Sequence, residues 1–285
     1  MPTLGKGIAL HTLIKRILII ALFTTDLYAG VIPKHRIPKN EDVIQVFDNA
    51  YKQVLPNNFN VVVWNMYKGK KDTWAADFRM LSENHDILIT QEMFLKGEMK
   101  SIFERENGFE FSCATSFFFD GEDRTGVATI SKFNSINQSF FRSKYREPIV
   151  RSPKMTLITK YALENGEELL VANIHAINFV VARKLEHQIK EVARAISEHD
   201  GPAIFAGDFN TWSRKKQRKM KQALREIGLT EVKYTEGPDN RMRIFGRVID
   251  YLWYKNLRLT RARVLGSVTG ADHIPMSHSF SVLDL

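Results

Sequence analysis

The stretch GPAIFAGDFNTW (201–212) brings a carboxylate and a carboxamide together at the end of an apolar run. Mostly apolar residues lead to Gly207, and Asp208 and Asn210 follow it two residues apart. Because alternate residues of a strand point to the same face, these two side chains can address one point in space. Carboxylate and amide oxygens are groups that hard cations such as Mg²⁺ prefer. The stretch is therefore the first candidate for a chemically active strand end.

Polar side chains end or interrupt several other apolar segments in the same way. The segments are VVVWN, ILITQE, ANIHAIN, RVIDYLWY and ADHIP, and the polar residues are Asn65, Glu92, His175, Asn178, Asp250, Asp272 and His273. Each alone has an ordinary explanation, since a strand-end Asn or Asp is usually a turn former or a helix cap. Their recurrence favours a functional cluster, because catalytic groups gather on loops at one edge of a sheet sandwich. Asp250 also needs a partner, because a charge inside an apolar strand is costly to bury.

In this order, the motifs WN, QE, NIHAIN, GDFN, IDY and DH form a series that resembles the endonuclease/exonuclease/phosphatase (DNase I-like) superfamily. The resemblance runs from about Asn60 to Leu285, and GDFN is its most specific element. The superfamily includes DNase I, exonuclease III-type repair nucleases, bacterial sphingomyelinases and inositol polyphosphate 5-phosphatases. The stretches ANIHAINF, AGDFNTW and FGR…IDY are most similar to a bacterial branch of uncharacterised YafD-like proteins.

This resemblance implies a divalent metal site for Mg²⁺, or alternatively Mn²⁺. Glu92 matches the family's principal metal carboxylate, Asn65 matches the amide beside it, and Asp272 matches a second carboxylate near the metal. Such an ion polarises the phosphoryl oxygens and offsets the charge that develops during hydrolysis.

The same resemblance implies a set of catalytic and phosphate-binding residues. Asp208 matches the residue that orients or deprotonates the attacking water, and Asn210 matches its neighbour that holds a phosphate oxygen. His273 matches the essential histidine, and Asp250 matches the aspartate that fixes its tautomer. His175 matches a second phosphate-facing histidine, and Asn178 matches a phosphate-contacting amide.

Two positions depart from the family pattern. Ala271 replaces the serine that usually precedes the Asp–His pair, which removes a hydroxyl hydrogen bond but no catalytic group. Tyr67 replaces the acid that follows the WN strand in abasic-site repair nucleases. His175 also points away from that subclass, in which a tyrosine is usual. The departures therefore argue against one subclass and leave the hydrolytic set intact.

Three functions remain open for this set. The first is a metal-dependent phosphodiesterase that acts as an endonuclease or exonuclease on nucleic acid, with the basic run SRKKQRKMK (213–221) gripping backbone phosphates. A solvated helix face explains that run slightly better, because its basic residues extend nearly all round the helix. The second is a sphingomyelinase-like or phosphoinositide phosphatase-like hydrolase of lipid or small-molecule phosphoesters, since one fold supports both chemistries. The third, a non-catalytic binding protein, is disfavoured by the complete residue set.

Strand-like and helix-like segments must position these residues. Apolar and alternating patterns predict strands over 59–65, 86–92, 109–119, 125–133, 154–163, 168–175, 202–208, 243–255, 258–268 and 273–283. Helices are predicted over 73–85, with Thr73 as cap, over 178–199, and along the basic run. Many strands with few helices between them predict an α+β fold with two β-sheets packed face to face and flanked by helices. The resemblance implies the four-layer DNase I-like sandwich with two mixed sheets.

The chain divides into three predicted parts: a signal peptide over 1–29, an N-terminal extension over 30–58 and the catalytic domain over 59–285. The first part carries basic residues before the apolar run ILIIALF (17–23), and the small residues Ala29 and Gly30 follow it. We therefore expect a secreted or periplasmic protein without a stable membrane span in its mature chain. The alternatives are a membrane anchor formed by residues 10–29 or a cytoplasmic amphipathic segment.

Composition narrows the possible partners. The formal net charge is +9, which favours anionic partners such as nucleic acid, although a solvated basic surface explains it too. A single cysteine, Cys113, excludes an intramolecular disulfide and a cysteine-rich metal site. Cys113 is expected to be a small buried residue. The substrate is expected to be nucleic acid or another phosphoester, and the protein is expected to be a monomer.

Overall fold

A computed structural model describes residues 35–148 and 150–283. These residues belong to one compact unit that begins at His35. The predicted signal peptide and the alternative anchor over residues 10–29 lie outside the described residues. Within the described part of the chain, no helix is long and apolar enough to span a membrane.

The first sheet is mixed and has eight strands. In spatial order they are β1 (His35–Arg36), β6 (Glu110–Phe119), β7 (Asp123–Ser131), β5 (Ile87–Phe94), β4 (Asn58–Asn65), β17 (Met276–Val282) and β16 (Leu257–Val264), and β2 (Ile44–Asp48) also pairs with β6. Strands β4 and β5 run parallel, whereas β17 runs antiparallel to β4. The carboxyl ends of β4 and β5 therefore meet at one edge of the sheet.

The second sheet is also mixed and has seven strands. In order they are β12 (Thr230–Glu231), β15 (Asp250–Lys255), β11 (Ala203–Asp208), β10 (Glu168–His175), β9 (Met155–Leu163) and β3 (Val54–Leu55), and β8 (Asn137–Arg142) pairs with β9. Strands β10 and β11 run parallel, and β15 runs antiparallel to β11. A separate hairpin of β13 (Arg243–Ile244) and β14 (Arg247–Val248) precedes β15.

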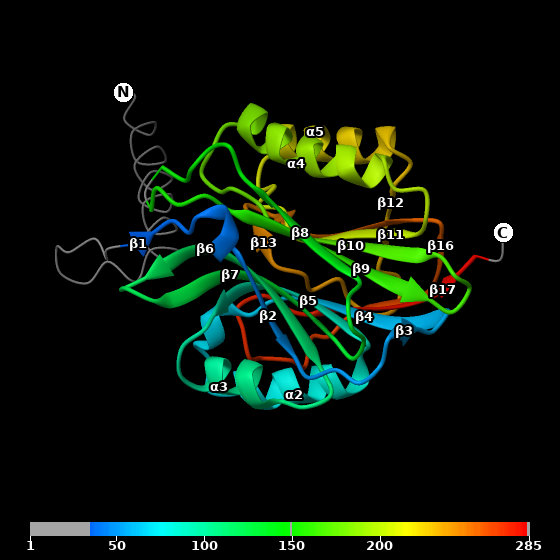
Figure 1. The fold of residues 1–285 in the computed structure, drawn as a ribbon. Helices are drawn as coiled ribbons and strands as arrows, with labels where there is room; N and C mark the ends of the chain where they lie inside the picture. Colours follow the sequence, from blue (N-terminus) through cyan, green and yellow to red (C-terminus); the bar gives the residue numbers. More distant parts are fainter. Residues whose placement is uncertain (1–34, 149, 284–285) are drawn as a thin grey trace, which may run out of the picture. The chain divides into compact units, whose positions relative to one another are not determined.

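Helices cover the outer faces of both sheets. The elements are α2 (Trp74–Asn84), α3 (Gly97–Arg105), α4 (Ala182–Ser197) and α5 (Arg214–Glu226), with short 3-10 turns η1 (Asn40–Asp42) and η2 (Tyr67–Gly69). Figure 1 shows α4 and α5 above one sheet and α2 and α3 below the other. The predicted α+β class, with two mixed sheets packed face to face between helices, is confirmed.

The side chains of β4 point alternately to two different apolar clusters, one on each face of the sheet. Val61 and Val63 belong to the apolar cluster between the sheets, which also contains Ile204 of the second sheet. Val62 and Trp64 point the other way, into the cluster that α2 and α3 cover. Full burial of such a side chain contributes about 1.5–3 kcal/mol. The continuous apolar run of β4 is therefore explained by burial on both faces.

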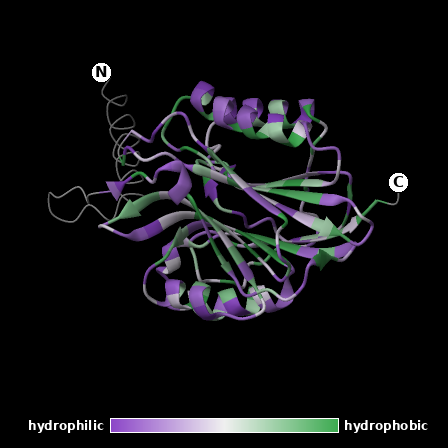
Figure 2. Ribbon diagram, viewed as in Figure 1, coloured by the Kyte–Doolittle hydropathy of each residue, from purple (hydrophilic) through white to green (hydrophobic). Residues whose placement is uncertain are grey.

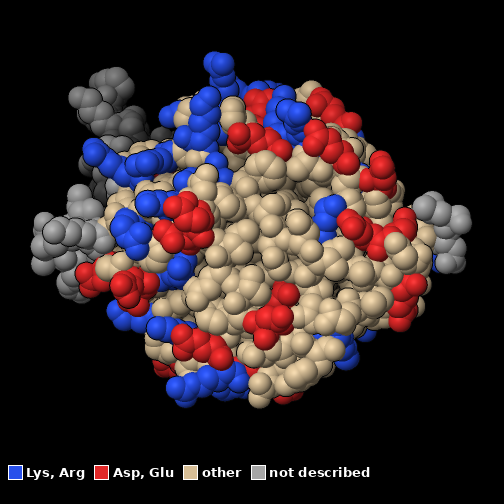
Figure 3. Space-filling model, viewed as in Figure 1, with Lys and Arg blue, Asp and Glu red and all other residues tan. Residues whose placement is uncertain are grey.

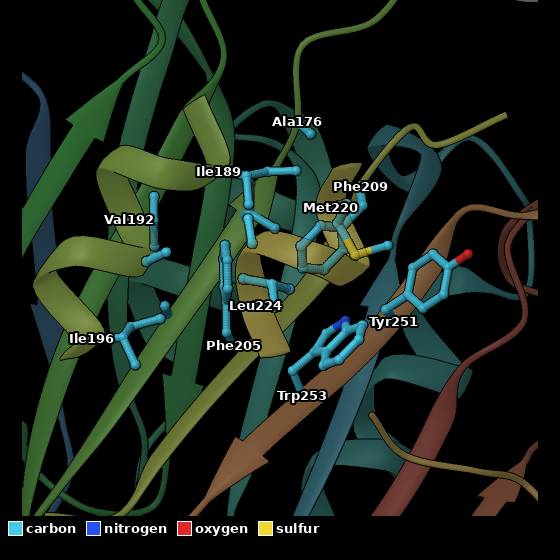
Figure 4. Close-up of a cluster of buried hydrophobic side chains, with 14 of the residues drawn as sticks. Ala176, Ile189, Val192, Ile196, Phe205, Phe209, Met220, Leu224, Tyr251 and Trp253 are labelled. Carbon is cyan, nitrogen blue, oxygen red and sulfur yellow. The ribbon is translucent and has the colours of Figure 1, made fainter. Parts of the chain in front are cut away.

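The helix pair α4 and α5 packs on the second sheet through a third cluster. Ile189 and Val192 of α4 and Met220 of α5 meet Phe205 and Trp253 of the sheet, as Figure 4 shows. Most polar residues of both helices lie on the side away from the sheet (Figure 2), with Gln188 and Lys216 as buried exceptions. This apolar stripe with a polar outer face is the ordinary pattern of a surface helix.

Several sequence-based boundaries differ from the structure. The segment expected as an N-terminal extension supplies β1 and β2 to the first sheet and β3 to the second. The helix predicted over 178–199 begins only at Ala182, because Phe179 has a left-handed backbone, with a φ of 52°. Thr73 precedes α2 as predicted but makes no capping hydrogen bond, and its hydroxyl lies 3.3 Å from that of Thr269. Cys113 is fully buried, as predicted.

Candidate active site

Three neighbouring strands of the second sheet bring three candidate residues into one row. In the register of the sheet, His175 at the end of β10 lies opposite Asp208 at the end of β11. Asp208 in turn lies opposite Asp250 at the start of β15. All three side chains are buried, with exposed fractions of 7%, 3% and 4%. Strand pairing alone therefore assembles one side of the predicted site.

The first sheet contributes the other half. Asn65 ends β4 opposite Gln91 of β5, and Glu92 follows at a β-bulge where the pairing with β7 shifts. Glu92 has a φ of 56°, so its side chain is turned out of the regular alternation. His273 lies in the loop before β17, and its carbonyl oxygen accepts a hydrogen bond from the indole nitrogen of Trp64 at 3.1 Å.

The two halves meet across the gap between the sheets. Asn65 Nδ2 lies 3.3 Å from Asp208 Oδ2 and 3.4 Å from Glu92 Oε1, so one amide bridges a carboxylate of each sheet. His273 Nδ1 lies 2.8 Å from Asp250 Oδ2, which also joins the two sheets. His175 Nε2 lies 3.6 Å from Asp208 Oδ2. The structure thus brings Asn65, Glu92, His175, Asp208, Asp250 and His273 together.

A buried amide pair holds the sheets together directly behind this cluster. Gln91 Nε2 donates to Asn173 Oδ1 at 2.8 Å, and Asn173 Nδ2 donates to the carbonyls of Thr90 and Ala128. Gly207 lies close to Gln91, because a Cβ there would lie 3.0 Å from Gln91 Nε2 and 2.0 Å from the Ile174 carbonyl oxygen. The positioning role of Gln91 and Asn173 is not among the sequence predictions, although each is a polar residue within an apolar strand.

Phosphate-facing amides were predicted at two further positions. The backbone of Asn210 is left-handed, its N–H donates to Asp208 Oδ1 at 2.9 Å, and its Nδ2 donates to the Ala176 carbonyl at 2.8 Å. The same amide carries a second hydrogen that can meet a phosphate oxygen. Asn178 lies at the rim, where its Oδ1 accepts from the Trp212 indole nitrogen at 2.8 Å.

The two histidines of the cluster have opposite electrostatic environments. Burial alone would lower the pKa of His273, but the carboxylates of Asp250, Asp208 and Asp272 outweigh it and raise the pKa to about 10. Burial, together with the positive charges of Lys154 and His273, holds the pKa of His175 well below its usual value. At neutral pH the first is an imidazolium and the second a neutral imidazole.

Burial and the proximity of like charges disfavour simultaneous ionisation of the carboxylates in the cluster. Burial raises the pKa of Asp208 to about 7, and the nearby charge of Asp250 adds to this effect. Desolvation by the surrounding protein, with Glu92 as a nearby carboxylate, also raises the pKa of Asp272. Asp272 is the most exposed of these acids. The negative charge of the carboxylates in the site is therefore not fully balanced by the positively charged side chains there.

Comparison of the sequence with known protein families identifies the family of the chain. The Endonuclease/Exonuclease/phosphatase family matches residues 62–273, which include every strand end described above. The chain belongs to this family. A UPF0294 protein from Vibrio campbellii is 38% identical over 245 residues, covering 85% of this chain and 84% of the relative. The predicted closeness to the YafD-like branch agrees with this similarity.

Solved structures show the same fold at low sequence identity. The catalytic domain of human nocturnin, solved with a bound sulfate, has a TM-score of 0.60 and 16% identity over 88% of this chain and 98% of that one. A mannosyl-6-phosphatase from Bacteroides thetaiotaomicron has a TM-score of 0.59 and 17% identity over 78% of this chain and 99% of that one. The DNase I-like fold of this endonuclease/exonuclease/phosphatase member is therefore shown. The family hydrolyses phosphoesters and generally uses divalent metals.

The donor set of this family member fits a divalent cation. Asp250 Oδ1 is buried without a hydrogen-bond partner among the described residues, which is a costly state for a carboxylate oxygen. Ligand atoms of Asp208, Asp250 and His273 lie within 4.8 Å of one another and could hold an ion. We consider Glu92 and Asp272 better ligands, because His273 and Asp250 already bind each other through Nδ1 and Oδ2. Hard oxygen donors of this kind suit Mg²⁺ or Mn²⁺.

Asn65 is oriented differently from the predicted metal ligand. Its amide nitrogen faces the two carboxylates, and its amide oxygen accepts a hydrogen bond from the backbone of Tyr67 at 3.1 Å. In this geometry Asn65 orients Glu92 and Asp208. Its role as a ligand remains a prediction.

Arg241 is a positioning residue that the sequence did not reveal. It lies in the polar segment before β13, yet its side chain is only 9% exposed. Its guanidinium donates to both carboxylate oxygens of Asp239 at 2.8 Å and to the backbone carbonyl of Asp250 at 3.1 Å. Arg241 therefore fixes the start of β15, from which the Asp250 side chain reaches His273. A polar segment without apolar periodicity gave no signal of this burial.

Proposed function

We propose that this protein is a divalent-metal-dependent phosphodiesterase that cleaves nucleic acid. The observation that carries the proposal is the joining of His273 to Asp250 at 2.8 Å across the sheets, with Asp208 and Glu92 in the same cluster. An orienting carboxylate, a cationic donor and a metal carboxylate in one place are the requirements of phosphoester hydrolysis.

Asp208 is the group that orients and deprotonates the attacking water. A carboxylate whose pKa is raised to about 7 by burial is a stronger base than an ordinary aspartate at neutral pH. Hydrogen bonds from the Asn210 backbone and from Asn65 fix one orientation of the Asp208 carboxylate. The fixed orientation keeps its basic oxygen directed at one water position.

His273 acts as a cationic hydrogen-bond donor to the phosphate. Asp250 accepts the Nδ1 proton, so the remaining N–H of the imidazolium, on Nε2, can meet an anionic phosphoryl oxygen. A histidine with a pKa raised to about 10 cannot serve as a general base at neutral pH. Neutral His175 and the Asn210 amide provide further donors to the phosphate oxygens.

Glu92 and Asp272 would hold Mg²⁺ or Mn²⁺, with Asn65 beside them. When bound, the ion would polarise the phosphoryl oxygens and neutralise the charge that develops during displacement. The bulge at Glu92 supports this role, because strained backbone of this kind is typical of functional sites.

Nucleic acid is the favoured substrate class because the protein is basic. Its net charge of +9 favours a polyanion. Lys68 and Lys70 follow Asn65 closely and add positive charge beside the site. Figure 3 shows lysines and arginines gathered along the upper and left margins of one face. Lipid and small-molecule phosphoesters are the alternative, which the experiment below separates.

The test is a substrate panel with purified protein. Plasmid DNA, RNA, sphingomyelin, a phosphoinositide and a sugar phosphate are each incubated with Mg²⁺, with Mn²⁺ and with EDTA. We expect cleavage of DNA or RNA that EDTA abolishes and Mg²⁺ or Mn²⁺ restores. If the protein hydrolyses only a lipid or sugar phosphate ester in a metal-dependent way, the nuclease proposal is wrong and the alternative substrate class is correct. Activity that persists in EDTA would contradict the metal-dependent proposal itself.

A further inference from the structure

An exposed aromatic ring stands at the tip of the β13–β14 hairpin. Phe245 is 56% exposed, and among the described residues Tyr51 is the other large aromatic exposed to this degree. Phe245 and Gly246 form the two-residue turn, with φ values of 51° and 74°. Such a turn needs left-handed backbone at both positions and favours Asn-Gly. Phenylalanine is not a residue that such a turn favours, and more than half of its side chain faces solvent, which points to a ligand.

The hairpin tip is joined to the catalytic loops. The ring of Phe245 packs edge-to-face on Trp212, with ring centroids 6.0 Å apart. Trp212 follows Asn210 by two residues, and its indole nitrogen donates to Asn178 at 2.8 Å. The pair formed by Trp212 and Phe245, here called the aromatic shelf, is therefore bound to both loops that carry predicted phosphate-binding amides.

Fixed contacts hold the aromatic shelf in place. Lys216 Nζ lies 4.1 Å from the ring centroid of Trp212 and packs against it as a cation. Arg247 of the hairpin donates to Gln217 Oε1 of α5 at 3.0 Å. The hairpin also leads into Asp250 only two residues after Val248. A rigid platform costs little ordering entropy when a flat group stacks on it.

The charged residues around the aromatic shelf indicate which class of flat ligand stacks on it. Arg243, which also pairs with Asp239 at 3.3 Å, and half-buried Arg247 flank Phe245 on the two strands of the hairpin. Lys216 is buried against Trp212 and supports the ring from within the protein. This combination of one ring and several cations matches a nucleotide, whose base is flat and aromatic and whose phosphate is anionic. A bilayer surface would require a larger apolar area than one exposed ring.

We propose that the aromatic shelf stacks an unpaired nucleobase next to the phosphate that is cleaved. The inference rests on the proposed function and deepens it, because it names single-stranded nucleic acid as the substrate. Stacking on a ring tolerates any base, so the shelf would select for unpaired nucleotides without reading sequence.

The test compares two anionic strands that differ only in their bases. A short oligothymidylate and a tetrahydrofuran-spacer strand of the same length carry the same phosphates, but the second has no bases. Binding is measured by fluorescence anisotropy in EDTA, and cleavage is measured in Mg²⁺. Phe245→Asn removes the ring and keeps a residue suited to left-handed backbone, whereas Phe245→Trp keeps a ring. Tyr51→Asn removes an even more exposed ring elsewhere and serves as the control.

We expect Phe245→Asn to weaken oligothymidylate binding at least about 5-fold and to leave the base-free strand unchanged. Phe245→Trp and Tyr51→Asn should bind both strands like the wild type. Equal losses on both strands, or no loss on either, would overturn the stacking inference. Lost binding to phosphatidylcholine–phosphatidylserine vesicles, with oligothymidylate binding unchanged, would assign the ring to a membrane instead.

The cleavage arm separates this inference from the proposed function. If the wild type cleaves both strands equally and Phe245→Asn does not alter this, the shelf fails while the nuclease proposal stands. If the wild type cleaves neither strand, nor DNA or RNA in the substrate panel, the proposed function fails.

Discussion

Two regions of this molecule are rich in ionisable side chains, and they differ in what surrounds those charges. In the catalytic cluster Asp208, Asp250 and His273 are at most 5% exposed and contact one another across the two sheets. On the outer side of α5, exposed Arg218, Gln222 and Arg225 line an open hollow together with half-buried Lys221. The hollow contains none of the catalytic carboxylates.

The difference shows that charge density alone does not mark a chemical site. Charges in water interact weakly, whereas buried charges shift each other's protonation strongly. On α5, Lys219 pairs with Glu186 of α4, and Lys221 pairs with Glu231 of β12. These pairs favour the interpretation of the basic run as a solvated face. Lys216, by contrast, turns inward to Asn210 and Trp212.

The largest effect is expected from removing the buried groups. His273→Ala and Asp208→Asn should each reduce kcat by about 10²-fold or more, because each removes a group that acts on the water or the phosphate. Turnover is measured on the substrate that the panel identifies, and circular dichroism checks the fold. Lys219→Ala on α5 is the control and should keep nearly full activity. Near-normal turnover by His273→Ala would show that the buried cluster matters no more for catalysis than the exposed face of α5.

A smaller effect is expected at the brace behind Asp250. Arg241→Met leaves Asp239 without its bidentate partner and frees the start of β15. We expect kcat to fall about 10-fold with little change in KM, because the catalytic pair is misplaced. The free energy of unfolding should fall by about 2 kcal/mol in urea denaturation. Arg261→Met breaks an exposed pair with Glu236 and should change neither quantity measurably.

Lys216 should make stability depend on pH in a defined window. Burial lowers its pKa from 10.5 to about 8, although Asp208 and Glu147 act in the opposite direction. Between about pH 8 and 10.5 the unfolded chain therefore holds a proton that the folded chain has lost. The contribution of Lys216 to stability must then rise with pH across this window.

The measurement is the urea unfolding midpoint of wild type and Lys216→Met at pH 7 and pH 10. Titrating groups that do not interact with Lys216 cancel in the difference between the two proteins. The wild type should gain stability relative to the variant at pH 10. If the difference in urea unfolding midpoint between the two proteins is the same at pH 7 and pH 10, the Lys216 ammonium group is not desolvated in the folded protein.

The smallest effect is expected on the exposed face of α5. If that face is merely solvated, Lys215→Ala/Arg218→Ala should leave the salt dependence of oligonucleotide binding unchanged. If the face contacts phosphates, the logarithmic salt slope should fall by about 0.7–0.9 for each lost contact. Binding at several salt concentrations distinguishes the two outcomes, and the second would make α5 part of the substrate path.

The sequence predicted the long buried elements well, because apolar periodicity reports burial directly. The strand predicted over 86–92 is β5 (Ile87–Phe94), and the one over 168–175 is β10. Short edge strands such as β1, with two residues, carry no such period. The helix α3 was missed, although Met99, Ile102 and Phe103 have helical spacing.

The residue types of the site were also visible, whereas their mutual contacts were not. A polar residue at the end of an apolar run can be read from one strand. The row of His175, Asp208 and Asp250 depends on which strands are neighbours, and periodicity does not specify strand order. The bridging orientation of Asn65 and the burial of Arg241 likewise arise from tertiary packing.

The central claim is that the two sheets divide one reaction, with the first holding the metal and the second activating the water. Magnesium titration of hydrolysis by EDTA-stripped wild type, Glu92→Gln and Asp208→Asn tests it most directly. Glu92→Gln should raise the Mg²⁺ concentration at half-maximal rate about 10-fold or more. Asp208→Asn should lower the rate at saturating Mg²⁺ without moving that midpoint. Equal midpoints for wild type and Glu92→Gln, or full activity without added metal, would contradict the account.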